Sequence, residues 1–297
     1  MEPVYKNLST DEWERKIGYL TDMFSDCRLC NHECGADRRE GEKGICEEGS
    51  TLRIASIQPH FGEEKPLVGR KGSGTVFLSG CSMSCVYCQN WRISQKNEGD
   101  LLDVEEMAEK MLYLQNKGCH NINWVTPTHF APLLVRSLHI ASEKGLEIPV
   151  VYNTGGYDNV ELLKGLEGVV DIYMPDVKYG SDEKADKYSS APGYWTNIKE
   201  GLKIMQEQVG DLKTDENDIA YRGILLRHLV LPGNLADSEK VLGFIKEEVS
   251  DNCHVNIMGQ YRPAYRSREY GKLSRRVKRK EVEKAREKAD EIGLKLI

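Results

Sequence analysis

Seven of the nine cysteines in this 297-residue chain lie in two short clusters, and their spacing constrains the fold more than any other feature. The clusters are Cys27, Cys30, Cys34 and Cys46, then Cys81, Cys85 and Cys88. An odd number of cysteines, with no apolar export signal in the first 25 residues, does not fit a disulfide framework. Both clusters are therefore expected to bind metal. Cys119 and Cys253 stand alone and are expected to be small buried hydrophobes.

Charge and composition argue against two classes of function. The 41 Lys and Arg residues are outnumbered by 47 Asp and Glu, for a net charge of −6, whereas nucleic-acid-binding domains are usually basic. No nucleic-acid partner is expected. The sequence holds no apolar run long enough to cross a membrane. With 39% hydrophobic and 30% charged residues, the composition is typical of a soluble, cytoplasmic globular protein.

From Thr75 onward the hydrophobic pattern alternates between strands and helices. Strands are expected at Thr75–Leu78, Asn121–Val125, Pro149–Asn153, Val169–Asp176, Gly223–Leu231 and His254–Met258. Helices are expected after the capping box of Asp103 and Glu106, after Pro132, and at about Tyr194–Val209 and Ser238–Val249. Alternating strands and helices predict parallel βα units. The chain is too short for eight such units, so we expect an α/β fold with an open, partial (β/α)6 barrel.

The remaining segments divide the chain into three predicted parts. Residues 1–70 contain an amphipathic helix within 1–26, the four-cysteine metal-binding segment and a turn-rich connection. Residues 71–265 form the barrel, with a polar loop at 211–219. Residues 266–297 form a charged helical extension.

The second cysteine cluster lies in a single loop after the first barrel strand, at residues 78–90 (LSGCSMSCVYCQN). A four-iron cluster ordinarily takes four cysteine thiolates, so three local cysteines would leave one iron open to a chelating group. A three-cysteine zinc site with an open position is the alternative. The ring of Tyr87 suits a wall over such a cluster or over a bound adenine.

The CxxxCxxC spacing of this loop resembles the signature of the radical S-adenosylmethionine (SAM) superfamily. The resemblance implies a [4Fe–4S] cluster on Cys81, Cys85 and Cys88, with SAM bound to the open iron. Reductive cleavage of SAM then gives a 5′-deoxyadenosyl radical that abstracts a substrate hydrogen. Over roughly residues 72–262 the chain is most similar to the pyruvate formate-lyase activating enzymes, closest to their PflX-like branch.

Three further segments carry this narrower resemblance, in the family's order. Asn153-Thr154 matches the Asp-Thr of the activating enzymes, residues 174–178 (MPDVK) match Met-Leu-Asp-Leu-Lys, and residues 227–233 (RHLVLPG) match Arg-Tyr-Val-Val-Val-Pro-Gly. The resemblance implies that Lys178 and Arg227 contact the carboxylate and ribose side of SAM. It also implies a monovalent cation held by Asn153, Thr154, Met174 and Asp176, with one acid fewer because Asn153 replaces an Asp. An Asp176–Lys178 ion pair and a buried pair for Arg227 are the structural alternatives.

One loop departs from the superfamily pattern. After the second strand, where Gly-Gly-Glu commonly holds the amino group of SAM, the sequence reads VTPTH at 125–129. Thr126 and Thr128 could supply the oxygen acceptors instead, and His129 is a weaker candidate at the barrel mouth. Gln260, Tyr261 and Arg262 follow the last strand, where they would either read the substrate or cap the loop.

The first cysteine cluster predicts a second metal centre whose identity stays open. Four thiolates close the tetrahedron of a structural zinc, which also folds small loops. They equally fit an auxiliary iron–sulfur cluster, although the spacing is not the ferredoxin run. The structural role is slightly favoured.

The predicted function is that of a radical SAM enzyme, resembling the activases that generate a glycyl radical on a partner enzyme. The resemblance implies a flavodoxin- or ferredoxin-type reductant. Action on a small molecule or another peptide is the alternative within the superfamily. A non-catalytic electron-transfer protein would not need cofactor-contacting residues at four strand ends. A zinc hydrolase would need an acid–base motif such as HExxH, which the sequence lacks.

Overall fold

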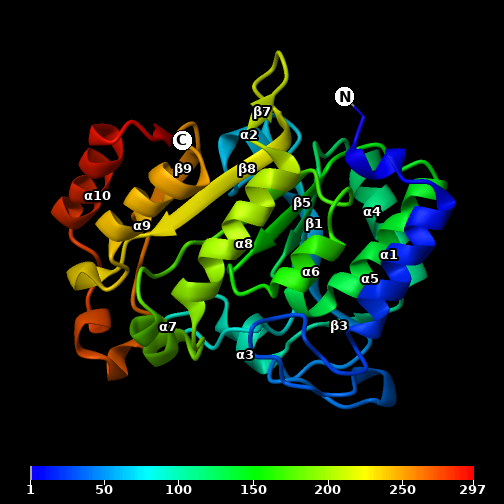
Figure 1. Ribbon diagram of the computed structural model, residues 1–297, viewed down its shortest axis with the longest axis horizontal. Coiled ribbons are helices and arrows are strands. Elements are labelled where there is room, and N and C mark those ends of the chain that lie inside the picture. Colours follow the sequence, from blue (N-terminus) through cyan, green and yellow to red (C-terminus); the bar gives the residue numbers. More distant parts are fainter. Residues whose placement is uncertain (1) are drawn as a thin grey trace.

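In the computed structural model, which describes residues 2–297, six neighbouring strands run parallel in one sheet (Figure 1). Their spatial order follows the chain: β2 (Ser73–Leu78), β4 (Ile122–Val125), β5 (Val150–Thr154), β6 (Ile172–Pro175), β8 (Ala220–Leu229) and β9 (His254–Met258). Helices connect these strands, as expected where parallel strands need crossovers. The predicted α/β architecture with a partial (β/α)6 barrel is confirmed.

Shorter strands extend both edges of the sheet. β1 (Leu52–His60) pairs antiparallel with β2, and β3 (Asp100–Leu102) pairs antiparallel with the start of β1. At the other edge β10 (Lys295–Leu296) runs parallel to β9. β7 (Lys213–Thr214) pairs with β8, within the predicted polar loop. The prediction of a turn-rich connection before β2 was therefore wrong for residues 52–60, where polar residues obscure the strand pattern.

The helices begin and end close to the predicted positions. α4 (Val104–Asn116) opens with the expected capping box, in which the Glu106 N–H donates to Asp103 Oδ1 at 2.7 Å. α8 (Tyr194–Val209) has the predicted bounds, whereas α9 (Ser238–Phe244) continues into a π-helical turn at Ile245–Val249. The remaining helices are α1 (Thr10–Asp22), α2 (Lys65–Val68), α3 (Trp91–Lys96), α5 (Ala131–Glu143), α6 (Val160–Gly165), α7 (Asp182–Ser189) and α10 (Arg279–Glu291). Over residues 2–297, no helix has the length and apolarity that a membrane span requires.

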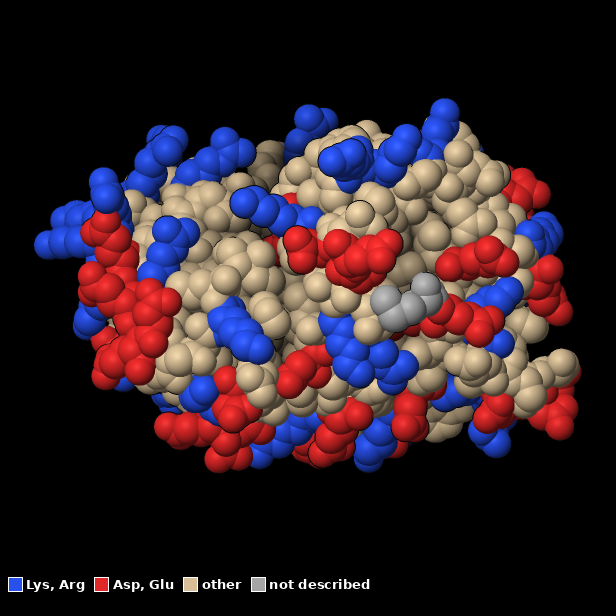
Figure 2. Space-filling view, turned by 90° about the horizontal axis from the view of Figure 1, so that it is seen from above, with Lys and Arg blue, Asp and Glu red and all other residues tan. Residues whose placement is uncertain are grey.

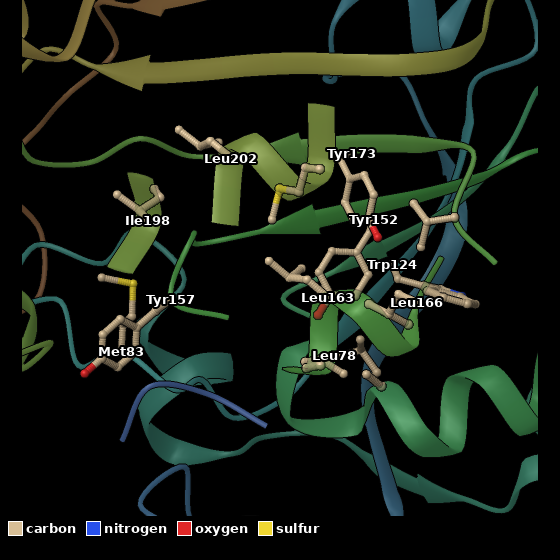
Figure 3. Close-up of a cluster of buried hydrophobic side chains, with 14 of the residues drawn as sticks. Leu78, Met83, Trp124, Tyr152, Tyr157, Leu163, Leu166, Tyr173, Ile198 and Leu202 are labelled. Atoms are coloured by element: carbon tan, nitrogen blue, oxygen red, sulfur yellow. The ribbon is translucent and has the colours of Figure 1, made fainter. Parts of the chain in front are cut away.

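The main core lies between the outer face of the sheet and its helices (Figure 3). Trp124, Tyr152 and Tyr173 project from β4, β5 and β6, and the two tyrosine rings lie 5.7 Å apart. Because side chains alternate along a strand, the intervening residues face the other way. Val151 and Ile172 pack there with Leu67 of α2, so α2 fills one end of the barrel interior.

The three segments predicted from sequence share one hydrophobic core. Leu20 and Phe24 join it from the N-terminal segment, and Leu294 joins it from the C-terminal one. Arg38 is fully buried where the four-cysteine segment meets the barrel. Its Nη1 donates to the His129 carbonyl at 2.6 Å, and its Nε donates to the Gly49 carbonyl at 3.1 Å. The cysteine-rich loop is thereby fixed beside α3, at the bottom of Figure 1.

Candidate active site

A cavity of about 190 Å³ lies at the carboxyl ends of the parallel strands, where barrel folds place their active sites. The loop after β2, and the ends of β4, β5, β6 and β8, all contribute to it. Its predicted site residues are Cys81, Cys85, Cys88, Thr126, Asn153, Thr154, Asp176, Lys178 and Arg227. Residues up to 146 positions apart in the sequence, Cys81 and Arg227, therefore meet in one place.

The three thiols of this cavity each have a hydrogen-bonding neighbour. The Met83 N–H lies 3.3 Å from Cys81 Sγ, the Ser189 hydroxyl donates to Cys85 Sγ at 2.9 Å, and the Ser94 hydroxyl lies 3.2 Å from Cys88 Sγ. Burial raises the pKa of the Cys81 and Cys85 thiols, while Lys178 opposes that rise at Cys85. Donors of this kind stabilise thiolates that bind a metal cluster.

Two cations in the cavity share one carboxylate. Asp176 accepts from Lys178 Nζ at 2.6 Å and from Arg227 Nε at 2.8 Å, and Arg227 Nη2 donates to Asn153 Oδ1 at 2.6 Å. Burial alone would raise the pKa of Asp176, but Arg227 and Lys178 hold it below its usual value. Both ion pairs that the sequence left as alternatives are thus present, and they position two cations at the cavity wall.

Sequence reasoning missed Glu63, which lies between β1 and α2. Its carboxylate lies 3.4 Å from Arg227 Nη1, and burial raises its pKa. The adjacent Glu64 accepts from Asn256 of β9 at 2.9 Å. The segment before α2 therefore reaches from β1 to β8 and β9. Two adjacent glutamates, Glu63 and Glu64, were visible in the sequence, but no sequence pattern indicated that Glu63 would contact Arg227.

The threonine candidates separate into two groups. Thr126 lines the cavity, with its backbone in the left-handed region (φ 61°), an uncommon conformation for a β-branched residue. Thr128 lies outside the cavity wall and donates to Asp158 Oδ1 at 2.7 Å. Thr154 lines the cavity but donates to Asp158 Oδ2 at 2.6 Å. Among the threonines at the cavity wall, Thr126 therefore remains as a potential acceptor.

None of the predicted aromatic and mouth residues lines the cavity. Tyr87 is buried against Tyr179 and Tyr261, and its hydroxyl accepts from Tyr179 at 2.7 Å. His129 is buried beneath the loop and donates from Nε2 to the Ser79 carbonyl at 2.7 Å; burial lowers its pKa to about 3. Gln260 and Arg262 are exposed. Neither Tyr87, His129 nor residues 260–262 line the cavity.

The four-cysteine segment packs directly against the loop that carries Cys81. His32 Nε2 lies 2.8 Å from the Ser82 carbonyl, and the Cys46 carbonyl lies 3.2 Å from the point where a Cβ on Gly80 would stand. The Cys34 and Cys46 sulfurs both approach Gly44, at 3.3 and 3.4 Å from the corresponding point. Burial first, and then the neighbouring thiols, raise the pKa of Cys30. The two predicted metal sites are thus neighbours.

Comparison with known proteins places this architecture in a family. The model of the radical SAM superfamily matches residues 75–217. An uncharacterized protein of Methanocaldococcus jannaschii is 34% identical over 292 residues, covering 95% of this chain and 79% of its own. The chain belongs to the radical SAM superfamily. A second uncharacterized M. jannaschii protein is 24% identical over 267 residues, covering 83% of this chain and 73% of its own.

The solved structures that resemble the chain have lower sequence identity. A radical SAM methyltransferase from Sphaerobacter thermophilus has a TM-score of 0.48 and 15% identity, with 74% of this chain and 65% of the methyltransferase covered. Streptococcus suis SuiB, bound to its precursor peptide SuiA, has a TM-score of 0.49 and 10% identity, with 73% of this chain and 46% of SuiB covered. The chain therefore spans less than two thirds of either protein.

Membership of the radical SAM superfamily implies a [4Fe–4S] cluster and SAM, and the residues present fit both. A cubane cluster takes one cysteine per iron, so its ligands need not converge on one atom. Within residues 2–297, no three His, Cys, Asp or Glu side chains are grouped to hold a single metal ion, and this holds for both cysteine clusters. The three hydrogen-bonded thiols share a cavity with two cations suited to a carboxylate. That donor set fits SAM beside a cluster.

The predicted monovalent cation has fewer available oxygens. Asp176 and Asn153 already bind Arg227, the Thr154 hydroxyl donates to Asp158, and Met174 is buried outside the cavity wall. The cation site stays a prediction.

Proposed function

We propose that this radical SAM protein cleaves SAM reductively at a [4Fe–4S] cluster held by Cys81, Cys85 and Cys88, and abstracts a hydrogen atom from its substrate. The single observation that carries this proposal is the meeting of these cysteines with Lys178 and Arg227 around one cavity. When bound and reduced, the cluster supplies the electron that divides SAM into methionine and a 5′-deoxyadenosyl radical.

The side chains of the chain itself would bind and orient SAM. Lys178 has three donor hydrogens and uses one on Asp176, so others can reach the methionyl carboxylate. Arg227 is held by Asp176 and Asn153, which leaves its planar group fixed at the ribose side. Thr126 lines the cavity, and its carbonyl and hydroxyl would take over the role of the superfamily's Gly-Gly-Glu loop in holding the amino group of SAM.

SAM binding tests these assignments without requiring turnover. We expect Lys178→Met to weaken SAM binding about tenfold or more, because a charge-assisted contact is lost. Lys184→Met is the matched control, since Lys184 also pairs with an aspartate, Asp237, at 2.5 Å but lies outside the cavity. Equilibrium dialysis with labelled SAM measures both variants. Equal affinities would contradict the role given to Lys178.

We propose that the substrate is a backbone glycine of a partner enzyme, so that hydrogen abstraction leaves a glycyl radical there. The supporting observation is the order of the segments at 153–154, 174–178 and 227–233, which resembles that of the activases. Incubation of the reduced enzyme with SAM and a glycyl-radical enzyme should produce the doublet of a glycyl radical in electron paramagnetic resonance. If only 5′-deoxyadenosine forms, a small molecule or another peptide becomes the better substrate class.

We also propose that the four-cysteine segment binds a second metal centre, either zinc or an auxiliary iron–sulfur cluster. Its support is the approach of the Cys34 and Cys46 sulfurs to the same point beside Gly44, where a Cβ would stand. A Cys81→Ala/Cys85→Ala/Cys88→Ala variant should retain only this centre. Metal analysis of the variant then distinguishes zinc from iron with sulfide, and metal-free protein would contradict the proposal.

A further inference from the structure

Residues 262–280 concentrate positive charge in a chain whose net charge is −6. They hold nine of its 41 Lys and Arg residues but one of its 47 Asp and Glu residues, Glu269. Arg266, Arg275 and Arg279 form ion pairs with glutamates. The other cations are exposed and have no carboxylate partner within residues 2–297: Arg262, Arg268, Lys272, Arg276, Lys278 and Lys280. We call these six residues the basic surface.

The backbone beneath the basic surface is fixed rather than loosely attached. The Tyr261 hydroxyl donates to the Leu273 carbonyl at 2.6 Å, and Leu273 is fully buried. The Tyr270 ring packs on Tyr188, with the centroids 5.7 Å apart. Figure 2 shows the molecule from above, and its left flank, where Figure 1 shows α10, carries Lys and Arg side chains beside Asp and Glu side chains. A rigid display of like charges, which costs self-repulsion, favours recognition of an anionic partner.

The start of this segment adjoins the cysteine loop and α3, outside the cavity. Tyr261 packs on Tyr87, with centroids 5.9 Å apart, and Tyr87 stands between Cys85 and Cys88 in the sequence. Tyr265 stacks on Trp91 of α3 at 5.4 Å. No residue of 262–280 lines the cavity that holds the cysteines and Lys178. A partner on this segment would thus approach the cysteines through aromatic rings, without entering the cavity.

We infer that the basic surface docks an acidic electron-donor protein, which reduces the cluster of the proposed function. A substrate must enter the cavity, whereas an electron can cross a layer of side chains, so the position favours a donor over a substrate. The donor's flavin hydroquinone or reduced iron–sulfur centre loses one electron and the cluster gains it, with no bond or proton transferred. Because acids outnumber bases in the rest of the chain, an acidic partner is repelled elsewhere and oriented here.

The test compares two variants with the same change in net charge. Arg268→Glu/Lys272→Glu/Arg276→Glu reverses the basic surface, and Lys110→Glu/Lys117→Glu/Lys213→Glu reverses exposed lysines elsewhere. Stopped-flow absorbance follows cluster reduction by a reduced acidic ferredoxin and, separately, by dithionite. We expect the ferredoxin rate of the first variant to fall about tenfold or more and to lose its dependence on salt, with the dithionite rates of both variants equal.

Three outcomes would overturn the inference. The first is reduction of the two variants by ferredoxin at equal rates. The second is a loss of reduction by dithionite in the first variant alone, and the third is binding of poly(U) RNA to the basic surface in preference to ferredoxin. The proposed function fails separately. A wild-type protein that dithionite reduces, but that forms no 5′-deoxyadenosine from SAM, would contradict the proposed function while the docking comparison still holds.

Discussion

Asp176 forms ion pairs with two cations at once, so its replacement should affect stability more than the loss of a single surface ion pair. Its side chain is 18% exposed, and Lys178 and Arg227 lie within 2.8 Å. Removal of one partner from a buried ion network leaves uncompensated charge. We therefore expect Asp176→Asn to lower the free energy of unfolding by about 2 kcal/mol, a value reduced from the fully buried case because some solvent screening remains.

Urea unfolding of this variant has a natural control. Glu248 pairs with Lys203 at 2.7 Å on the surface, where both side chains are about half exposed. Glu248→Gln should leave the urea midpoint nearly unchanged, because exposed ion pairs contribute little to stability. Equal losses in the two variants would show that Asp176 does not hold the cavity charges together.

His228 predicts how stability depends on pH. Its Nδ1 donates to the Val177 carbonyl at 2.7 Å and its Nε2 accepts from the Ser238 hydroxyl at 2.9 Å, and burial lowers its pKa to about 4. The unfolded chain protonates near pH 6.5, so the stability from neutral His228 is complete above that pH and is lost as the pH falls toward 4.

Replacement of this histidine should flatten the acid side of the stability profile. Between pH 6.5 and pH 5, the wild-type free energy of unfolding should fall by about 2 kcal/mol more than that of His228→Gln. Urea unfolding at the two pH values measures the difference. Parallel profiles would mean that His228 titrates alike in the folded and unfolded states.

At the scale of elements, two glycines differ in whether the structure has room for a side chain at their position. A Cβ on Gly74 of β2 would stand 2.5 Å from the Asn121 carbonyl oxygen, whereas one on Gly243 of α9 would meet nothing within 4 Å. We expect Gly74→Ala to destabilise by about 2 kcal/mol, and Gly243→Ala to stabilise by up to about 1 kcal/mol. Thermal unfolding checks both signs, and stabilisation by Gly74→Ala would refute the packing of β2 on the start of β4.

The elements that were predictable from sequence carry a strong local signal. The six parallel strands are short apolar runs, and the capping box of Asp103 and Glu106 marks the start of α4. β1 was not predicted because its second half lacks an apolar alternation. Ser56, Gln58 and His60 are polar, and in the sheet they are half-buried or exposed. The two-residue β10 has too little sequence to show a pattern; its pairing with β9 is a tertiary effect.

Some residues of the candidate site were also predictable from sequence, and others were not. Cysteines and charges at strand ends were predictable, because strand ends of a parallel sheet meet. Which hydroxyls face the cavity was not, since Thr128 and Thr154 are drawn to Asp158, a residue beyond either motif. The Glu63–Arg227 contact joins positions 164 residues apart, and no local rule connects them.

At the scale of the whole molecule, Arg38 ties the cysteine-rich segment to the barrel. Its guanidinium donates to buried carbonyls on both sides and lies 4.4 Å from the ring centre of Phe24. Arg38→Met should leave those carbonyls unpaired and cost about 3 kcal/mol of unfolding free energy. Arg39→Met is the control, because its exposed guanidinium makes one long contact, 3.7 Å to Asp22. Equal chemical stability of the two variants would show that the segment does not depend on Arg38.

The central claim is that three cysteines and a charged cavity make this fold a radical SAM enzyme. The most direct test is anaerobic: reconstitute the protein with iron and sulfide, reduce it with dithionite, add SAM and quantify 5′-deoxyadenosine. We expect product from the wild type and from Cys119→Ala, which replaces a buried cysteine outside both clusters, and none from Cys85→Ala. Iron-loaded wild-type protein that forms no more 5′-deoxyadenosine than Cys85→Ala would contradict this role of the three cysteines.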